Sequence, residues 1–422
     1  MGEHNGTGLT IDKTRRDAYS FFLEISSHNT DTMEHANHFR DAGAERYHAF
    51  DNLRGILLML LLVLHASISY MVTPLGTTWP FKDSSTHVIF DIAGAFIHTF
   101  RLPLFFVMAG FFGAKLYYER GAREFLKNRL QRIAIPLIIF WVLLAPLILA
   151  PFALIYLDPG SRTFMGVVSS LVNTDTRSHL HFFHLWFLFD LLVYYGAVLL
   201  VIQLSRLARL TWGDGSRRKL GLLFRSAWGP LVFVAVTAIS LLPMELGMLE
   251  TPATFARPLS TLFANVVFFL FGWGLYIRRD LVGCLPSRAW GYTSLAILFF
   301  VAHLACLPSL INGNRVFHIP SIVFASLSIW LFVYGIMGLF IRYCSRPNRV
   351  WRYIADSSYW CYLVHLPLIA WLSILLADWR IPAILKYAIV LFTTVLVCLL
   401  TYDRFVRSTP IGALINGRRH PR

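Results

Sequence analysis

Charged side chains are scarce in this 422-residue chain, because Asp, Glu, Lys and Arg together make up only 14% of it. An ordinary soluble domain carries about 25% charged residues, so this scarcity argues against a soluble globular protein. The hydrophobic fraction is 56% and the mean hydropathy is +0.58, which excludes a disordered chain. The composition therefore predicts a membrane protein that crosses the bilayer many times.

Cysteine and familiar catalytic motifs are also in short supply. The five cysteines are an odd number with no C-x-x-C pair, so they indicate neither a disulfide framework nor a zinc cluster. The sequence contains no H-E-x-x-H metal motif, no G-x-S-x-G nucleophile elbow and no glycine-rich phosphate loop. We therefore expect no metal site, and we expect any chemistry to rest on His, Arg and a bound cofactor.

Ten apolar stretches approach the length that a transmembrane helix needs, about 20 residues for a hydrocarbon core of about 30 Å. Two of them are irregular, because the fifth is short and contains Pro230, and the second is interrupted at Arg101 and Pro103. The predicted fold class is all-α, a polytopic membrane protein of about ten transmembrane helices. The expected spans are residues 53–73, 88–113, 134–157, 183–204, 227–243, 259–277, 289–308, 319–341, 358–376 and 382–402.

Lys and Arg alternate in density between successive loops. The two tails and the even-numbered loops carry 29 of the 38, whereas the odd-numbered loops carry six. Cytoplasmic loops are enriched in Lys and Arg, so we expect both termini in the cytoplasm. A polar tail at 1–45 and a basic tail at 406–422 would flank the transmembrane domain at 46–405. The net charge of +15 is then mainly topological, and nucleic acid is not an expected partner.

The basic segment 114–133 has two explanations. Its cations alternate with Leu, Phe and Tyr, which is typical of an interfacial helix on anionic lipid. A cytoplasmic site for a phosphate-bearing donor fits the same composition.

Ionisable side chains inside the predicted spans are the candidate functional residues, since a charge within a bilayer is costly. Arg54 and His65 lie eleven residues apart in the first span, so they share a helix face and are separated by about 16 Å along the axis. Asp91, His98 and Arg101 form a polar stripe in the second span, where Asp91 could orient His98. An interhelical hydrogen-bond seam would explain the same stripe.

Two later spans carry further candidates. Ser358, Tyr362 and His365 have the spacing of one helix face in the ninth span. The fourth span opens with HLWFL, which contains His184 and Trp186. An aromatic belt at the membrane interface accounts for Trp186 equally well.

Four strings of the sequence resemble signatures of the integral-membrane acyltransferase 3 family. FDNLRGILLMLLLVLHASISY, with its R-x10-H spacing, resembles the first span of that family. FIHTFRLPLFFVMAGFFGAKLYYERGAREFLKNRLQRIAIPL resembles its next element, an F-F-x-x-x-G-[FY] helix leading to a basic segment that ends in R-x-x-R-I-x-[IL]-P. HLWFL and SYWCYLVHLP match later signatures in the right order. The resemblance covers about residues 46–405.

Within the family, the F-I-H-x-F-R string is similar to members that succinylate osmoregulated periplasmic glucans. This resemblance implies a multi-pass protein of the bacterial inner membrane that moves a succinyl group from cytoplasmic succinyl-CoA to hydroxyls of periplasmic glucans. Its partners would be an acyl-CoA, a glucan or other envelope glycan, and membrane lipid. In one departure, Leu366 follows His365 where those members have a second His before the Pro.

The resemblance also suggests roles for the candidate residues. We expect His65 to act as general base on a glucosyl hydroxyl, or on a relay group, while the CoA thioester is attacked. Guanidinium is always charged and forks onto phosphate, so an arginine would bind CoA phosphates or polarise the carbonyl. The catalytic candidates are His65, His98, Asp91 and His365. The substrate-binding candidates are Arg54, Arg101, Arg132, His184, Trp186 and Tyr362.

Other functions fit part of this pattern. The same fold with acetyl-CoA as donor would be an O-acetyltransferase of a lipopolysaccharide or another envelope glycan. A transporter of small molecules or glycans is a different class, but transporters often contain paired half-repeats, and none is visible in the sequence. A purely structural membrane protein would not need Arg and His in several spans.

Overall fold

The computed structural model describes residues 48–75, 79–158, 182–208, 229–251 and 258–416, together with residues 163, 165–167, 169 and 221. Regular structure in these residues is entirely helical, so the predicted all-α class is confirmed. The expected polar tail at 1–45 lies outside the described residues.

Eight helical stretches of the described residues are long and apolar enough to cross a membrane, so the chain is a multi-pass membrane protein. Shorter elements are the helices α7 (Gly229–Leu241) and α13 (Pro410–Asn416) and the π-helical turns η3 (Leu130–Ala134) and η8 (Tyr402–Val406). The long helices are the first helix (His48–Tyr70), α2 (Val88–Arg129), α3 (Ile135–Tyr156), α5 (Trp186–Leu207), α8 (Leu259–Ile277), α9 (Ala289–Ile311), α10 (His318–Tyr343), α11 (Arg349–Leu375) and α12 (Ala383–Thr401).

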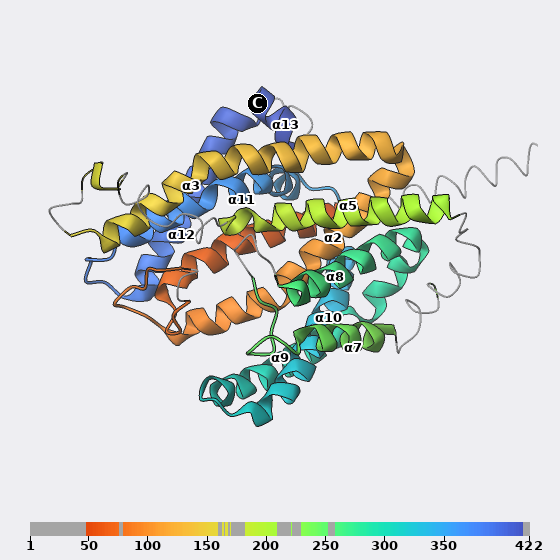
Figure 1. The fold of residues 1–422 in the computed structure, drawn as a ribbon, viewed down its shortest axis with the longest axis horizontal. Coiled ribbons are helices and arrows are strands. Elements are labelled where there is room, and N and C mark those ends of the chain that lie inside the picture. Colours follow the sequence, from red (N-terminus) through yellow and green to blue (C-terminus); the bar gives the residue numbers. More distant parts are fainter. Residues whose placement is uncertain are drawn as a thin grey trace, which may run out of the picture.

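The predicted number of about ten spans differs from eight for two reasons. The second and third predicted spans belong to one helical stretch, Val88–Ile155, although the chain turns back within it and continues as α3 (Figure 1). The fifth predicted span is α7, whose 13 residues extend only about 20 Å at about 1.5 Å per residue. That length is less than the hydrocarbon core of about 30 Å. Each predicted span still coincides with a helix, and the orientation of the termini stays a prediction.

The chain reverses within α2, at Gly121 (Figure 1). This is the one residue within α2 with non-helical backbone angles, φ 81° and ψ 170°. No atom lies within 4 Å of the place where a Cβ would stand, so glycine is needed for the backbone conformation and not for space. By contrast, α2 passes through Arg101 and Pro103 as a continuous helix. The charge and the proline that interrupt the apolar stretch therefore do not break the helix.

Close helix packing at the centre of the bundle depends on small residues. A Cβ added to Gly110 of α2 would collide with the backbone oxygen of Phe269 in α8, and one added to Gly272 of α8 would collide with the backbone oxygen of Val107. The two backbones therefore touch directly, as small residues allow in transmembrane helix pairs. This contact holds the middle of α2 in place.

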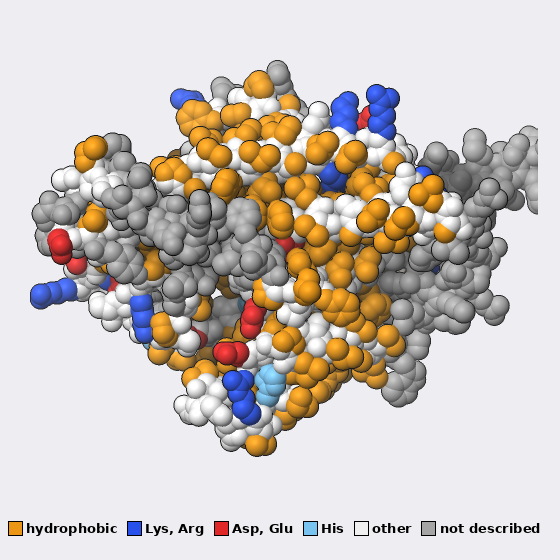
Figure 2. All heavy atoms as spheres, in the orientation of Figure 1, with side chains coloured by type: hydrophobic (Ala, Val, Ile, Leu, Met, Phe, Trp, Pro, Cys, Tyr) orange, Lys and Arg blue, Asp and Glu red, His pale blue; other side chains and the backbone are white. Residues whose placement is uncertain are grey.

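The outer surface is largely apolar. Hydrophobic side chains cover most of the described surface on the face shown in Figure 2, and charged side chains there are few. Large apolar residues on several helices are more exposed than a soluble protein would allow, among them Ile138 at 63%, Leu298 at 60% and Phe392 at 70%. Such a surface is suited to contact with lipid chains.

Candidate active site

Three histidines from distant parts of the chain meet inside the bundle. His65 lies in the first helix, His365 lies in α11, and His184 lies in η5 (Phe183–Leu185), the short turn that leads into α5. Nδ1 of His65 is 2.8 Å from Nε2 of His365, and their rings stack with centroids 5.0 Å apart. The ring of His184 stands at 78° to that of His365, at 4.9 Å. The R-x10-H, HLWFL and YLVH motifs therefore come together in space.

The hydrogen bonds of His365 determine which nitrogen of each ring carries a proton. Nδ1 of His365 lies 2.7 Å from the carbonyl oxygen of Tyr362 and 3.1 Å from that of Cys361. A carbonyl oxygen can only accept, so a neutral His365 donates from Nδ1 and accepts at Nε2. His65 must then donate from its own Nδ1. The Nε2 atom of His65 is left with a free lone pair, which is the property a general base needs.

The third histidine is held by backbone contacts. Nε2 of His184 lies 3.0 Å from the carbonyl oxygen of Leu363, and its buried Nδ1 has no hydrogen-bond partner. The hydroxyl of Tyr362 donates to the carbonyl oxygen of His184 at 2.9 Å. The preceding residue, Phe183, has φ 49°, the one positive φ of a non-glycine among the described residues. Backbone strain of this kind is common at functional sites.

The other substrate-binding candidates near this cluster are Arg101 and Trp186. Arg101 is 6% exposed, and its charge acts on both His65 and His365. Trp186 is also buried, and its ring packs against Phe187 at 6.3 Å. Arg101 is therefore close enough to act electrostatically on the histidine cluster, and the substrate-binding role of Trp186 stays a prediction.

Two catalytic candidates form other contacts. The carboxylate of Asp91 accepts hydrogen bonds from the backbone N–H groups of Val72 and Thr73, at 2.8 and 2.9 Å. Nε2 of His98 lies 2.7 Å from the carbonyl oxygen of Leu249. The expected Asp91–His98 pair is therefore wrong, because both carboxylate oxygens bind the loop after the first helix.

Arg54 and Arg132 lie away from the histidines. Arg54 is half-exposed, forms an ion pair with Asp51 at 3.4 Å and lies 5.6 Å from the ring centroid of Phe112. The backbone oxygen of Arg132 accepts a hydrogen bond from Tyr359 at 2.8 Å. The two arginines thus remain candidates for the phosphate end of a donor.

Sequence reasoning did not single out Arg129, one turn before Arg132. Its guanidinium lies 4.7 Å from the ring centroid of Tyr195 and 5.3 Å from that of Phe125. Arg129 is the first arginine of the R-x-x-R pattern in the second signature, and this pattern could have identified it. From the sequence, that segment was interpreted only as a basic region. Arg129 extends the cationic region next to Arg132.

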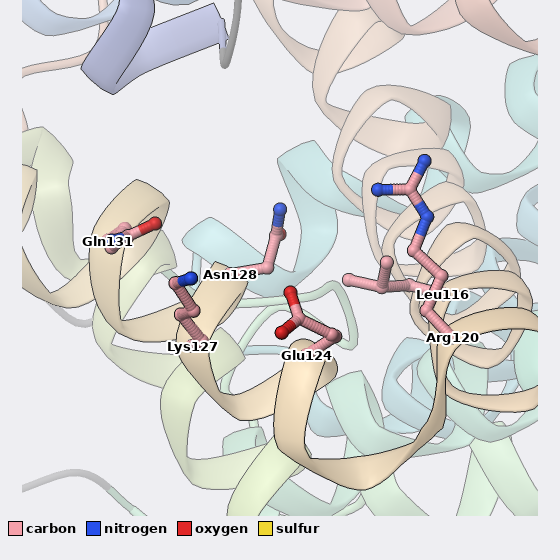
Figure 3. A pocket seen from close by; sticks show the side chains of 6 residues that line it. All are labelled: Leu116, Arg120, Glu124, Lys127, Asn128 and Gln131. Carbon is pink, nitrogen blue, oxygen red and sulfur yellow. The ribbon is translucent and has the colours of Figure 1, made fainter.

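A small hollow lies in the corner that the chain makes at Gly121. It has a volume of about 160 Å³, and polar side chains from both sides of the corner point into it (Figure 3). Its lining residues are Leu116, Arg120, Glu124, Lys127, Asn128 and Gln131. These residues belong to the basic segment 114–133, which the structure therefore folds into a helical corner.

A buried ion pair was also missed. Nζ of Lys386 in α12 lies 3.0 and 2.8 Å from the carboxylate oxygens of Asp83, and 3.0 Å from the carbonyl oxygen of Ala377. Lys386 and Asp83 are both buried. A cation at the edge of a predicted span resembles a lysine that reaches toward water, so the sequence did not reveal this contact.

The three histidines do not form a metal site. In the described part of the chain, no group of three or more His, Cys, Asp and Glu side chains is arranged to hold a metal ion. The geometry explains why for the histidines, because His65 and His365 direct nitrogens at each other and His184 directs Nε2 at a carbonyl oxygen. The cluster is instead suited to proton transfer.

Comparisons with known proteins identify the family of this chain. Residues 47–403 match the model of a family described as an acyltransferase domain. The Glucans biosynthesis protein C of Escherichia coli (strain K12) is 24% identical over 331 residues, which are 77% of this chain and 82% of that protein. The protein of the same name from Salmonella schwarzengrund (strain CVM19633) is 22% identical over 393 residues, 89% of this chain and 96% of that protein. No solved structure is significantly similar. Since the family match spans most of the chain and contains the histidine cluster, the chain belongs to this family of membrane acyltransferases.

Proposed function

We propose that this acyltransferase moves a succinyl group from succinyl-CoA in the cytoplasm to hydroxyl groups of periplasmic glucans, at the bacterial inner membrane. The relatives named Glucans biosynthesis protein C support a glycan acceptor. The distribution of Lys and Arg among the loops supports a cytoplasmic position for the end of the bundle that carries Arg54. The observation that carries the proposal is the hydrogen bond between His65 and His365.

The reaction uses His65 as the base. Its Nε2 takes the proton of the acceptor hydroxyl as that oxygen attacks the thioester carbonyl carbon of the donor. A carbon–oxygen ester bond forms and the carbon–sulfur bond breaks. The imidazolium then returns the proton to the departing CoA thiolate, which leaves as the thiol. His365 accepts the Nδ1–H of His65 throughout, so it orients the base and stabilises its charged form.

The donor would span the distance between Arg54 and His65. Arg54 and Arg132 bind the phosphates of CoA, and the acyl thioester reaches the base about 16 Å further along the first helix. The side chain of Arg54 is 44% exposed and Arg132 is partly exposed, so a large polar donor has access to both residues. His98 and Asp91 make other contacts, so they take no part in this mechanism.

Replacement of His65 tests the proposal. Membranes that contain the His65→Ala variant should fail to succinylate glucan, and periplasmic glucans from cells without the gene should lose their succinyl adducts in mass spectra. Wild-type succinylation by His65→Ala would refute the assignment of the base. Glucans that keep their succinyl groups when the gene is absent would refute the substrate, and a loss of acetyl groups from another envelope glycan would then identify the acetyltransferase.

A further inference from the structure

Arg101 is a buried cation with no counterion in the part of the chain that the structure describes. Its side chain is 6% exposed, and its Nε atom makes no hydrogen bond. Its guanidinium lies 6.0 Å from the ring centroid of Phe105, which supplies only a weak attraction for a cation. An unpaired charge in a water-poor interior is strongly unfavourable. An anion that enters with a substrate would remove this penalty.

The position of Arg101 decides which part of a substrate meets it. Its guanidinium lies beside Phe105, whose ring packs at 5.4 Å against Phe187, three residues after His184. Its charge also acts on His65 and His365, so Arg101 lies at the level of the reacting atoms. The phosphates of a CoA donor would be bound about 16 Å away along the first helix, near Arg54. Arg101 is therefore too deep in the bundle to serve as a phosphate ligand, and the anion it meets belongs to the acyl group.

We propose that Arg101 binds the free carboxylate of a dicarboxylyl group in the donor and so selects succinyl over uncharged acyl groups. This inference rests on the proposed function, acyl transfer at His65. Two methylene groups separate the free carboxylate of a succinyl group from its reacting carbonyl, so both ends stay within the same cluster. An acetyl group has no carboxylate and leaves the cation uncompensated.

The alternative role, polarisation of the thioester carbonyl, accounts less well for the burial of Arg101. A carbonyl oxygen offers only a partial charge, whereas a carboxylate offers a full charge and two oxygens that match the guanidinium fork. The two roles also differ in what they predict. A residue that polarises the carbonyl serves every acyl donor equally, whereas a residue that binds the free carboxylate serves only dicarboxylyl donors.

Butyryl-CoA separates the two roles, because it has the same four-carbon chain as succinyl-CoA without the carboxylate. The full chain, purified in detergent, would be assayed with each donor and a glucan acceptor. We expect the wild type to prefer succinyl-CoA in kcat/KM. Arg101→Met should lower kcat/KM for succinyl-CoA by roughly 10²-fold, as expected for truncation of one partner of a buried charge pair, and should change butyryl transfer little. Arg101→Lys should keep a preference for succinyl-CoA.

A matched control is Arg407→Met, which removes a cation that pairs with Asp403 at 3.3 Å and should leave the donor preference unchanged. Equal use of both donors by the wild type, or an equal loss with both donors in Arg101→Met, would overturn the role of Arg101 and leave the acyltransferase mechanism intact. A wild type that transfers neither acyl group would overturn the proposed function and this inference together. If Arg101→Met fails to fold, a loss of donor preference in Arg101→Lys would also contradict the inference.

Discussion

The Nδ1 atom of His65 lies 2.8 Å from Nε2 of His365, although the two residues are 300 positions apart in the chain. The direction of this hydrogen bond is set on the far side of His365, where the carbonyl oxygen of Tyr362 accepts the Nδ1 proton at 2.7 Å. His365 therefore presents a lone pair to His65, and His65 keeps its own lone pair for the substrate. The two imidazoles act as one unit in which His65 is the base and His365 positions it.

Replacement of His365 tests this division of roles. We expect His365→Phe to lower kcat by about 10²-fold or more, a typical size for the loss of general-base catalysis, while the KM for the donor changes little. The reason is that Phe keeps a flat ring but offers no lone pair to the Nδ1–H of His65. Steady-state kinetics of the purified variant would measure both constants. An unchanged kcat, or a loss confined to KM, would contradict the positioning role; His87→Ala, at the start of α2, serves as a control outside the cluster.

Tyr362 offers a second test, because its hydroxyl donates to the carbonyl oxygen of His184. Tyr362→Phe should lower the free energy of unfolding by about 1 to 3 kcal/mol, the usual cost of a buried acceptor left without its donor. Thermal unfolding in detergent would measure the loss. The control is Tyr343→Phe, which removes the hydroxyl that accepts a hydrogen bond from Nε1 of Trp290 at an exposed position. This variant should lower the free energy of unfolding much less. Equal stability of Tyr362→Phe and the wild type would show that this hydrogen bond does not hold η5 in place.

The positions of the helices and the members of the histidine cluster were predictable from the sequence to different degrees. Long apolar stretches predict spans because the bilayer requires them, and the R-x10-H and YLVH motifs identified His65 and His365 separately. The contact between them was not predictable, since it depends on how the first helix and α11 pack. Helix packing in a membrane is determined by close contact of complementary surfaces and leaves little trace in a hydropathy pattern.

The sequence predicted the wrong partner for a polar side chain that binds the backbone of a neighbouring loop. Asp91 appeared to face His98 because both lie on one stripe of α2, but its carboxylate binds two backbone N–H groups of the preceding loop. The reversal at Gly121 was not predicted either, because the backbone angles of that residue are unusual and the composition around it is not. In each case the deciding contact or conformation involves the backbone, which sequence patterns describe poorly.

The requirement for glycine at position 121 can be tested by substitution with alanine, which adds a single methyl group. Gly121→Ala should destabilise the protein by about 1 to 3 kcal/mol, because at φ 81° and ψ 170° the Cβ of an L-residue meets the carbonyl group of the preceding residue. The matched control is Gly196→Ala in α5, where a Cβ also has open space but the φ is not positive. That variant should be neutral or slightly more stable, since alanine favours a helix. Equal effects of the two substitutions on thermal unfolding would contradict a conformational role for Gly121.

The buried pair of Lys386 and Asp83 predicts a strong interaction between two substitutions. Lys386→Met alone should destabilise the protein by about 3 to 5 kcal/mol, because it leaves the carboxylate of Asp83 buried without its cation. Asp83→Leu alone should cost a similar amount. The double variant should be much more stable than the sum of the two losses indicates, since it removes both charges, and thermal unfolding of all four proteins would measure this coupling.

An exposed pair supplies the control for that experiment. Lys115 and Glu119 are also 2.9 Å apart, but their side chains are 31% and 43% exposed, so water screens their attraction. The same double-mutant cycle there should give a coupling of about 0.3 to 0.5 kcal/mol. If the two cycles give the same small value, burial does not strengthen the Lys386–Asp83 pair. In that case the loop between the first helix and α2, which contains Asp83 and Ser85, would be attached to α12 mainly by the hydrogen bond from the backbone N–H of Ala383 to Ser85 at 2.9 Å.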